Sequence, residues 1–148
     1  MNEEESYVLI KLHSAIQERN LEMVEFLLKS GADVNERNNC NLAPIHFAVW
    51  TGDSNILKIL VQNGANLEAR DLYGFTALHL ACLNNDLEAV EYLIFNGAKI
   101  SSMDNNRKTP LEYFFNSNSI ETFELLVKKY SNKLSMKALV EKNILRKK

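Results

Sequence analysis

A fixed interval of 33 residues organises this sequence. His13, His46 and His79 are spaced by that interval, and an alanine follows each of them two positions later. Glycine-alanine pairs begin at positions 31, 64 and 97, again 33 residues apart. A period of this length marks a stack of supersecondary units, each of which buries its apolar face only against its neighbours. The sequence therefore predicts a repeat array, and such arrays usually offer a surface to be bound rather than a pocket for chemistry.

The third unit shows the local structure most clearly. Asp71 and Gly74 bracket a turn, because aspartate bonds its own backbone and glycine accepts a positive φ. Thr76 is placed to cap a first short helix, and Asp86 is placed to cap a second. Gly97 supplies the left-handed residue that ends the second helix. Neither helix is long enough to hold itself in water, so stacking must stabilise both.

The other units repeat these signals in register. Good N-cap residues precede the second helices at Asn20, Asp53, Asp86 and Ser119. Leucines that we expect to be buried recur in the same helices at Leu27, Leu60, Leu93 and Leu126. Pro44 and Pro110 fall where first helices begin, at the one helical position that tolerates proline. Each unit is thus predicted to be a turn, a short helix, a second helix and a long loop.

These units resemble the ankyrin repeat. The motif T-A-L-H-L-A occupies Thr76–Ala81, and A-P-I-H-F-A occupies Ala43–Ala48. The segments G-A-D-V-N at Gly31–Asn35 and G-A-N-L-E at Gly64–Glu68 match the loop that closes an ankyrin unit. The resemblance covers nearly the whole chain. It implies an all-α ankyrin-repeat solenoid of about four stacked helix-turn-helix units, joined by β-turn or hairpin loops.

We expect a single domain of four repeats followed by a tail. The predicted boundaries are 1–37 for an N-terminal capping repeat, then 38–70, 71–103 and 104–132, with a basic capping helix or tail at 133–148. Repeat four has Glu112 in place of the histidine and Arg107 in place of the turn glycine. Terminal repeats drift in this way because they need a polar outer face. The alternative interpretation of the tail is the start of a fifth repeat from a longer parent.

Charge is divided unevenly along the chain. Residues 128–148 carry eight basic side chains and one acid, a net +7, which leaves −9 for residues 1–127 of a chain whose net charge is −2. An acidic body is a poor surface for nucleic acid, which needs clustered Lys and Arg. The basic tail is either a solvated terminal helix or a contact for an acidic partner or membrane surface.

Composition and the cysteines predict a location. No apolar run approaches the roughly 18–20 residues that span a bilayer, so membrane insertion is not expected. The acidic start M-N-E-E-E-S lacks the positive region of a secretory signal. Cys40 and Cys82 make no disulfide framework, which suits a reducing compartment. We expect a cytoplasmic or nuclear protein, acting in its own cell or in a host cell.

Neither catalysis nor metal binding is predicted. The histidines share one register on successive units, so they lie a whole repeat apart and do not converge on one ion. The resemblance implies a structural role for them, because the histidine of this motif is structural in ankyrin repeats. Cys82 lies on an apolar helix face, whereas Cys40 is expected at an exposed turn tip with no activating neighbour. Motifs for nucleotide binding, hydrolysis and metal binding are missing, so we expect neither enzyme activity nor a cofactor.

One loop asparagine is a candidate for modification. Ankyrin loops can be substrates of asparaginyl hydroxylation, and Leu27 with Asp33-Val34-Asn35 resembles the favoured context. The alternative is that Asn35 is an ordinary loop-forming residue, because Asp, Val and Asn are common at these positions.

The resemblance also indicates where a partner would bind. In ankyrin stacks the turn tips and the open side of the first helices form a concave groove. The residues of this chain at those positions that we predict to bind a partner are Leu42, Trp50, Thr51, Leu72, Tyr73, Phe75, Leu83, Asn84 and Lys108. Five of them are large and apolar although neither the core nor the turns require it: Trp50, Leu72, Tyr73, Phe75 and Leu83. Apolar clusters of this kind usually mark a contact site, and Trp and Tyr dominate binding hot spots.

Three functional hypotheses follow. The first is a monomeric protein-binding module whose groove across repeats two and three holds another protein, as an adaptor or as a masking inhibitor. The second is a structural role, in which the same patch mediates self-association or continues a larger solenoid. The third assigns the function to the basic tail, docking on an acidic lipid or protein.

Overall fold

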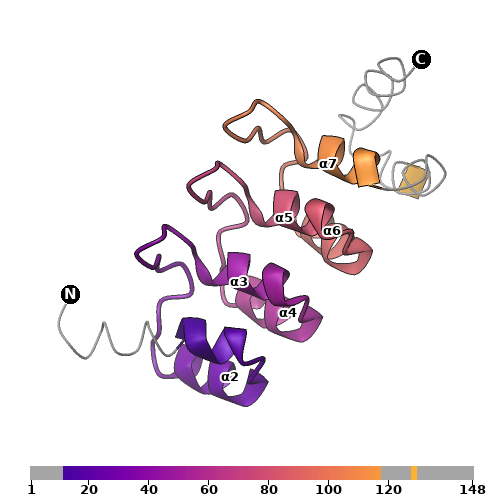
Figure 1. The fold of residues 1–148 in the computed structure, drawn as a ribbon. Coiled ribbons are helices and arrows are strands. Elements are labelled where there is room, and N and C mark those ends of the chain that lie inside the picture. Colours follow the sequence, from indigo (N-terminus) through magenta and orange to yellow (C-terminus); the bar gives the residue numbers. More distant parts are fainter. Residues whose placement is uncertain (1–11, 118–127, 130–148) are drawn as a thin grey trace, which may run out of the picture.

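The structure, a computed structural model, describes residues 12–117 together with Lys128 and Lys129. Within these residues all regular elements are helices, and they follow one another in pairs (Figure 1). Successive pairs lie side by side along one axis, and the loops that join them project to the same side of the stack (Figure 1). The all-α solenoid predicted from the 33-residue period is confirmed.

The first helix of each unit is short, and most of its described side chains are buried. These helices are residues 12–17, α3 (Pro44–Thr51), α5 (Ala77–Leu83) and α7 (Pro110–Ser117). Proline opens α3 and α7 as predicted. At α5 the hydroxyl of Thr76 accepts a hydrogen bond from the backbone N–H of His79, which confirms Thr76 as the N-cap.

The second helices are amphipathic and well capped. They are α2 (Leu21–Lys29), α4 (Ser54–Gln62) and α6 (Leu87–Phe95). The side chains of Asn20, Asp53 and Asp86 each accept a hydrogen bond from the backbone N–H three residues ahead, at 3.0, 3.1 and 3.1 Å. A cap of this kind contributes about 1 kcal/mol, and the predicted register of these three caps is confirmed.

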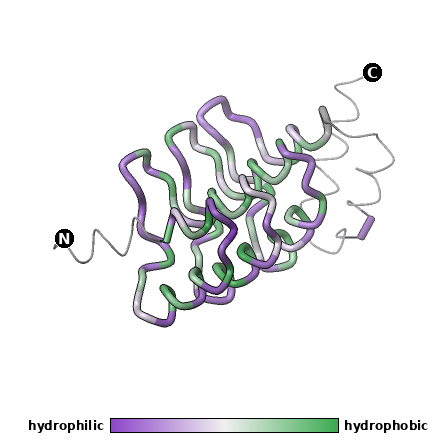
Figure 2. The backbone as a smooth tube through the Cα atoms, turned by 60° about the horizontal axis from the view of Figure 1, so that its bottom comes forward, coloured by the Kyte–Doolittle hydropathy of each residue, from purple (hydrophilic) through white to green (hydrophobic). Residues whose placement is uncertain are grey.

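The core runs through the stack from unit to unit. In the first helices it contains Leu12, Ile45, Leu78 and Leu111, and in the second helices Leu27, Leu60 and Leu93. Hydrophobic residues gather along the helices, whereas hydrophilic residues predominate on the projecting loops (Figure 2). Each fully buried side chain of this size contributes about 1.5–3 kcal/mol of transfer free energy, which no unit could collect without its neighbours.

His46 and His79 cap their own helix and bond to a loop carbonyl farther along the chain. The backbone N–H of Ala43 donates to Nδ1 of His46 at 3.0 Å, so Nδ1 carries no proton and the opposite nitrogen, Nε2, must. That Nε2–H donates to the carbonyl oxygen of Ala69 at 3.0 Å. His79 makes the same cap with the backbone N–H of Thr76, and its Nε2 bonds to the carbonyl of Lys108 in the following unit, at 3.1 Å each. The shared register of the histidines therefore reflects a repeated structural contact.

Repeat four makes the same cap with different chemistry. The carboxylate of Glu112 accepts hydrogen bonds from the backbone N–H of Thr109 at 2.7 Å and from its hydroxyl at 3.1 Å. A carboxylate can replace an imidazole at this position because both present an acceptor to the N-cap backbone. Arg107 takes a positive φ of 61° where repeat three has Gly74 at 79°.

Glycine is required in the turn of repeat three because the next unit approaches closely. A Cβ atom at Gly74 would lie 2.6 Å from Oδ1 and 2.9 Å from the backbone nitrogen of Asn105. In the same loops, the backbone N–H of Asn105 donates to the carbonyl of Tyr73 at 3.0 Å. The projecting loops are therefore packed on one another and hold the turn tips in fixed positions.

Several predictions concern residues outside those that the structure describes. They include the predicted cap Ser119, the predicted buried Leu126 and the basic tail at 133–148. The repeat boundaries at 37, 70, 103 and 132 stay predictions. Within the described part of the chain, none of the helices combines the length and the apolar character needed to cross a membrane.

Candidate partner-binding groove

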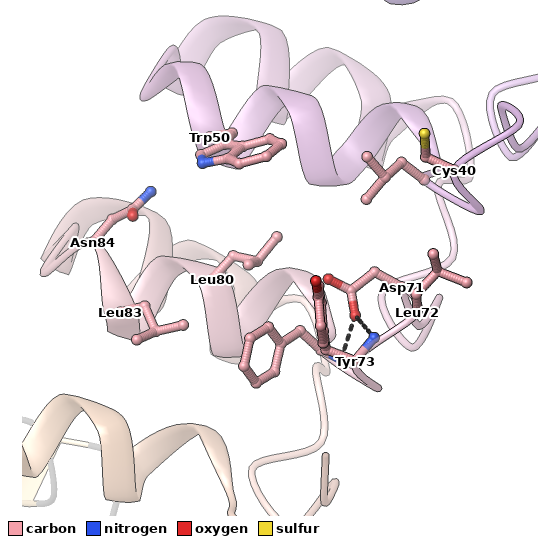
Figure 3. A pocket seen from close by; sticks show the side chains of 10 residues that line it. Cys40, Trp50, Asp71, Leu72, Tyr73, Leu80, Leu83 and Asn84 are labelled. Atoms are coloured by element: carbon pink, nitrogen blue, oxygen red, sulfur yellow. Dashed lines mark hydrogen bonds between the residues drawn. The ribbon is translucent and has the colours of Figure 1, made fainter. Parts of the chain in front are cut away.

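A groove with a volume of about 480 Å³ lies between α3 and α5 and the turns that precede them (Figure 3). Its walls are mainly apolar. The residues that line it are Cys40, Leu42, Trp50, Asp71, Leu72, Tyr73, Phe75, Leu80, Leu83 and Asn84. This volume lies within the range of pockets that hold a ligand or a few side chains.

The structure brings together most of the residues predicted to bind a partner. Seven of the nine line the groove, namely Leu42, Trp50, Leu72, Tyr73, Phe75, Leu83 and Asn84. Thr51 and Lys108 do not line it. The hydroxyl of Thr51 donates to the carbonyl of Ala48 at 3.1 Å, and Lys108 places its Nζ 5.4 Å from the ring centroid of Tyr113 in the same unit.

Three large side chains at the rim are mostly exposed to solvent. Trp50, Leu72 and Tyr73 expose 63%, 65% and 71% of their surface. Phe75 is half-buried, because its ring stacks on His79 at 5.6 Å and meets the edge of Tyr113 at 5.5 Å. Phe75 is therefore partly a structural residue of the next interface, whereas Trp50, Leu72 and Tyr73 gain little from the folded monomer.

Leu80 explains why the groove is open, and it was missed in the sequence. The positions 33 residues before and after it hold Phe47 and Tyr113. Phe47 meets the ring of His13 edge-on at 5.0 Å, and Tyr113 meets the ring of His79 at 6.2 Å. At the interface between repeats two and three the smaller, half-buried Leu80 takes this place. A comparison of the residue sizes at this position across the units could have revealed the groove from the sequence.

Asp71 is the charged residue of the groove and was predicted only as a turn residue. Its Oδ1 accepts hydrogen bonds from the backbone N–H groups of Tyr73 at 2.8 Å and Phe75 at 2.9 Å (Figure 3). These two bonds fix the turn that carries Leu72 and Tyr73 to the rim. Asp71 therefore both shapes the groove and places a carboxylate in its wall.

Two smaller polar residues complete the lining. The amide of Asn84, the C-cap residue of α5, donates to the carbonyl of Val49 in α3 at 3.3 Å. Cys40 is exposed at its turn tip, as predicted, and its thiol is free. Cys82 is buried in α5, and burial raises the pKa of its thiol. Of the two thiols, Cys40 is the accessible one.

The neighbouring interface shows how the same elements look when the gap is filled. The hydroxyl of Tyr113 donates to Oδ2 of Asp104, the residue equivalent to Asp71. Burial and this bond raise the pKa of Tyr113 to about 12. Although burial alone would raise the pKa of Asp104, the bonds from Tyr113 and from two backbone N–H groups hold it below its usual value. At neutral pH Tyr113 therefore stays a phenol and Asp104 a carboxylate, and their hydrogen bond joins α7 to the turn that precedes it.

The candidate modification site, Asn35, connects repeats one and two. Its amide donates to the carbonyl of Gly64 at 3.1 Å, and its Oδ1 accepts from the backbone N–H of Asn66 at 2.7 Å. Both polar atoms of the side chain are thus used between the loops, although the residue is exposed. This contact accounts for an asparagine at this position, and hydroxylation of Asn35 stays a prediction.

The described residues show no arrangement suited to metal chemistry. In the ranges 12–117 and 128–129, no three His, Cys, Asp or Glu side chains are grouped closely enough to hold a metal ion. In His46 and His79 both ring nitrogens are hydrogen-bonded to backbone groups, as described above. What the groove offers is apolar contact area, one carboxylate and one amide.

Comparison with known proteins identifies the family. The family model described as "Ankyrin repeats (3 copies)" matches residues 12–104 and again residues 45–137, two spans offset by one 33-residue unit. No curated protein matches the chain significantly. Ankyrin repeats are generally protein–protein interaction modules, and the family is typically non-catalytic. The two matched spans together cover most of the sequence, and this chain belongs to the ankyrin repeat family.

Proposed function

We propose that this chain is a non-catalytic binding module that holds a partner protein in the groove between α3 and α5. The observation that carries the proposal is the exposure of Trp50, Leu72 and Tyr73 around one hollow. Large apolar side chains left in water cost free energy that only a covering surface recovers, at about 25 cal/mol per Å² of apolar area. Trp and Tyr are also the residues that most often dominate an interface.

Binding of this kind acts by occupancy. The module would link the partner to other proteins as an adaptor or cover a functional surface of the partner as an inhibitor. A monomer suffices for either role, because all the lining residues belong to one chain. The proposed setting is the cytoplasm or the nucleus, and the free thiols of Cys40 and Cys82 support it.

The experiment is affinity capture with matched variants. Trp50→Ala/Tyr73→Ala removes two exposed rings of the groove, and Phe95→Ala removes an equally large ring that is 76% exposed at the end of α6, outside the groove. We expect proteins that are captured by wild type and by Phe95→Ala but lost by the double variant. If the double variant captures the same proteins as wild type, the groove is not the binding site.

A second measurement uses the natural thiol at the rim. Because Cys82 is fully buried and Cys40 is exposed, a maleimide dye under native conditions should label Cys40 alone. A partner seated in the groove should protect Cys40 from labelling, and prior attachment of a bulky maleimide should block the partner. Unchanged labelling rates in the presence of a bound partner would place the partner elsewhere.

Self-association through the same groove is the second candidate function. Tyr73 is the observation that favours it, since 71% of this ring is exposed beside the hollow and a second copy could insert it. Sedimentation velocity over a range of concentrations separates the candidates. A concentration-dependent dimer that Tyr73→Ala abolishes supports self-association, whereas a monomer at all concentrations supports a different partner protein.

A further inference from the structure

Comparison with repeat four shows which side chain would fill the groove beside Leu80. In repeat four, Asp104 uses Oδ1 for the backbone N–H groups of Asn106 at 2.8 Å and Lys108 at 2.9 Å, and it uses Oδ2 for the hydroxyl of Tyr113. Asp71 repeats the Oδ1 bonds. Because the residue equivalent to Tyr113 is Leu80, no hydrogen bond from the described residues reaches Oδ2 of Asp71.

The groove between repeats two and three therefore lacks two things that the next interface has. It lacks an aromatic ring beside the histidine, and it lacks a hydroxyl on the carboxylate of the turn. Both would come from one tyrosine side chain. Among the described residues that line the apolar groove, Asp71 is the one that carries a charge, so this lining favours a hydrogen-bond donor and opposes a second anion.

We propose that the groove accepts a tyrosine side chain of the partner protein, with its ring against Leu80 and its hydroxyl donating to Oδ2 of Asp71. This inference rests on the proposed function and specifies what the groove recognises. The partner's tyrosine takes the place that Tyr113 occupies one unit further along. With a volume of about 480 Å³ the groove also has room for apolar neighbours of that tyrosine, which would lie against Trp50 and Tyr73.

The test uses peptide libraries that differ at one fixed position. Degenerate octapeptides with a central Tyr, Phe, Lys, Arg or phosphotyrosine are passed over the immobilised full chain. We expect the tyrosine library to be retained about tenfold more than the phenylalanine library, since a hydrogen bond to a charged group has roughly this effect. The phosphotyrosine library should be retained least, because its charge is repelled by Asp71.

Two variants assign the preference to the proposed contacts. Asp71→Asn should fold normally, because Asn38 holds the same turn in repeat two through the backbone N–H groups of Cys40 at 2.9 Å and Leu42 at 3.0 Å. In this variant the preference for tyrosine should fall to about threefold, since a neutral amide replaces a charged acceptor. In Leu80→Tyr the protein's own tyrosine ring should fill the proposed tyrosine site, so no library should be retained.

Each other result overturns the proposal in a recognisable way. Equal retention of the tyrosine and phenylalanine libraries excludes the bond to Asp71. Preferred retention of the lysine or arginine library shows that the carboxylate selects a cation. If no library is retained although protein capture still depends on Trp50 and Tyr73, or if Leu80→Tyr binds like wild type, the tyrosine site is wrong and the protein-binding function remains. Loss of the dependence on Trp50 and Tyr73 would instead contradict the proposed function itself.

Discussion

The interface between repeats two and three and the interface between repeats three and four are built from the same parts and end in different states. Both have a buried histidine bonded to a loop carbonyl and a turn whose carboxylate accepts hydrogen bonds from two backbone N–H groups. The second interface is closed by Tyr113, which contacts Phe75 and clasps Asp104. The first has Leu80 and stays hollow.

The difference shows that one side chain can decide whether an interface is filled or hollow. The residues that hold the helices together are the same type in both interfaces, so the solenoid does not depend on the choice at this position. Replacing an aromatic residue by a leucine leaves apolar walls in place and removes what covered them. A hollow lined by apolar side chains thus arises between units of the same design.

The largest effect that we expect is the cost of opening the closed interface. Tyr113→Ala should lower the free energy of unfolding by about 3 kcal/mol, because it removes a packed ring and leaves the carboxylate of Asp104 without its hydroxyl donor. Leu80→Ala in the open interface should cost about 1.5 kcal/mol, since this side chain is only half-buried. Urea unfolding of both variants tests the comparison. Equal losses would show that the two interfaces are energetically alike.

A smaller effect of opposite sign is expected on closing the open interface. Leu80→Tyr should raise the free energy of unfolding by about 1 kcal/mol, since the new ring covers apolar walls and its hydroxyl can reach Asp71. Urea unfolding at constant m-value is the measurement. Leu80→Phe is the matched control, because it adds the ring without the hydroxyl. A loss of stability in both variants would mean that the groove cannot accommodate a ring.

Removing the exposed tryptophan should matter less for stability. Trp50→Ala should lower the free energy of unfolding by about 0.5 kcal/mol, because the side chain is 63% exposed and its ring contact with Phe47 is loose, with centroids 6.4 Å apart. The midpoint of urea unfolding gives the answer. A loss of several kcal/mol would show that Trp50 is a structural residue and would weaken its assignment to binding.

The smallest change in the free energy of unfolding should come from lowering the pH from 7 to 6, without any substitution. Burial lowers the pKa of His46 and His79 below 6.5, so the unfolded chain gains protons before the folded one. The contribution of the two histidines to the free energy of unfolding is complete above pH 6.5. It is lost as the pH falls, because a proton on Nδ1 removes the acceptor of a backbone N–H. Stability measured at pH 7, 6 and 5 should decline through this series. A flat or rising profile would contradict the assigned tautomers.

Much of the fold could be predicted because the same capping and core residues recur in several units. The caps Asn20, Asp53 and Asp86 and the buried leucines follow from local rules that each unit restates. The candidate groove was predicted in large part for the same reason, since exposed positions such as Trp50 and Tyr73 could be recognised by their register.

What the sequence did not reveal depends on how side chains of different units fit together. Leu80 looks like one more apolar helix residue until its size is compared with Phe47 and Tyr113. Lys108 was expected at the groove, but its side chain lies over Tyr113, a choice set by a neighbouring ring rather than by register. Sequence period locates a position, whereas the direction and the fit of the side chain come from its neighbours in space.

The histidine contacts also give the stack a direction of dependence. His13 and His79 bond through Nε2 to a carbonyl of the following unit, at Leu42 and Lys108, and the guanidinium of Arg70 donates forward to Met103. Other bonds run the opposite way, such as those from Asn84 to Val49 and from Asn105 to Tyr73, so the dependence lies in the histidine contacts. Removing repeat four would leave the buried Nε2–H of His79 without its acceptor, whereas removing repeat one would leave the carbonyl of Leu42 to water, which satisfies it more easily.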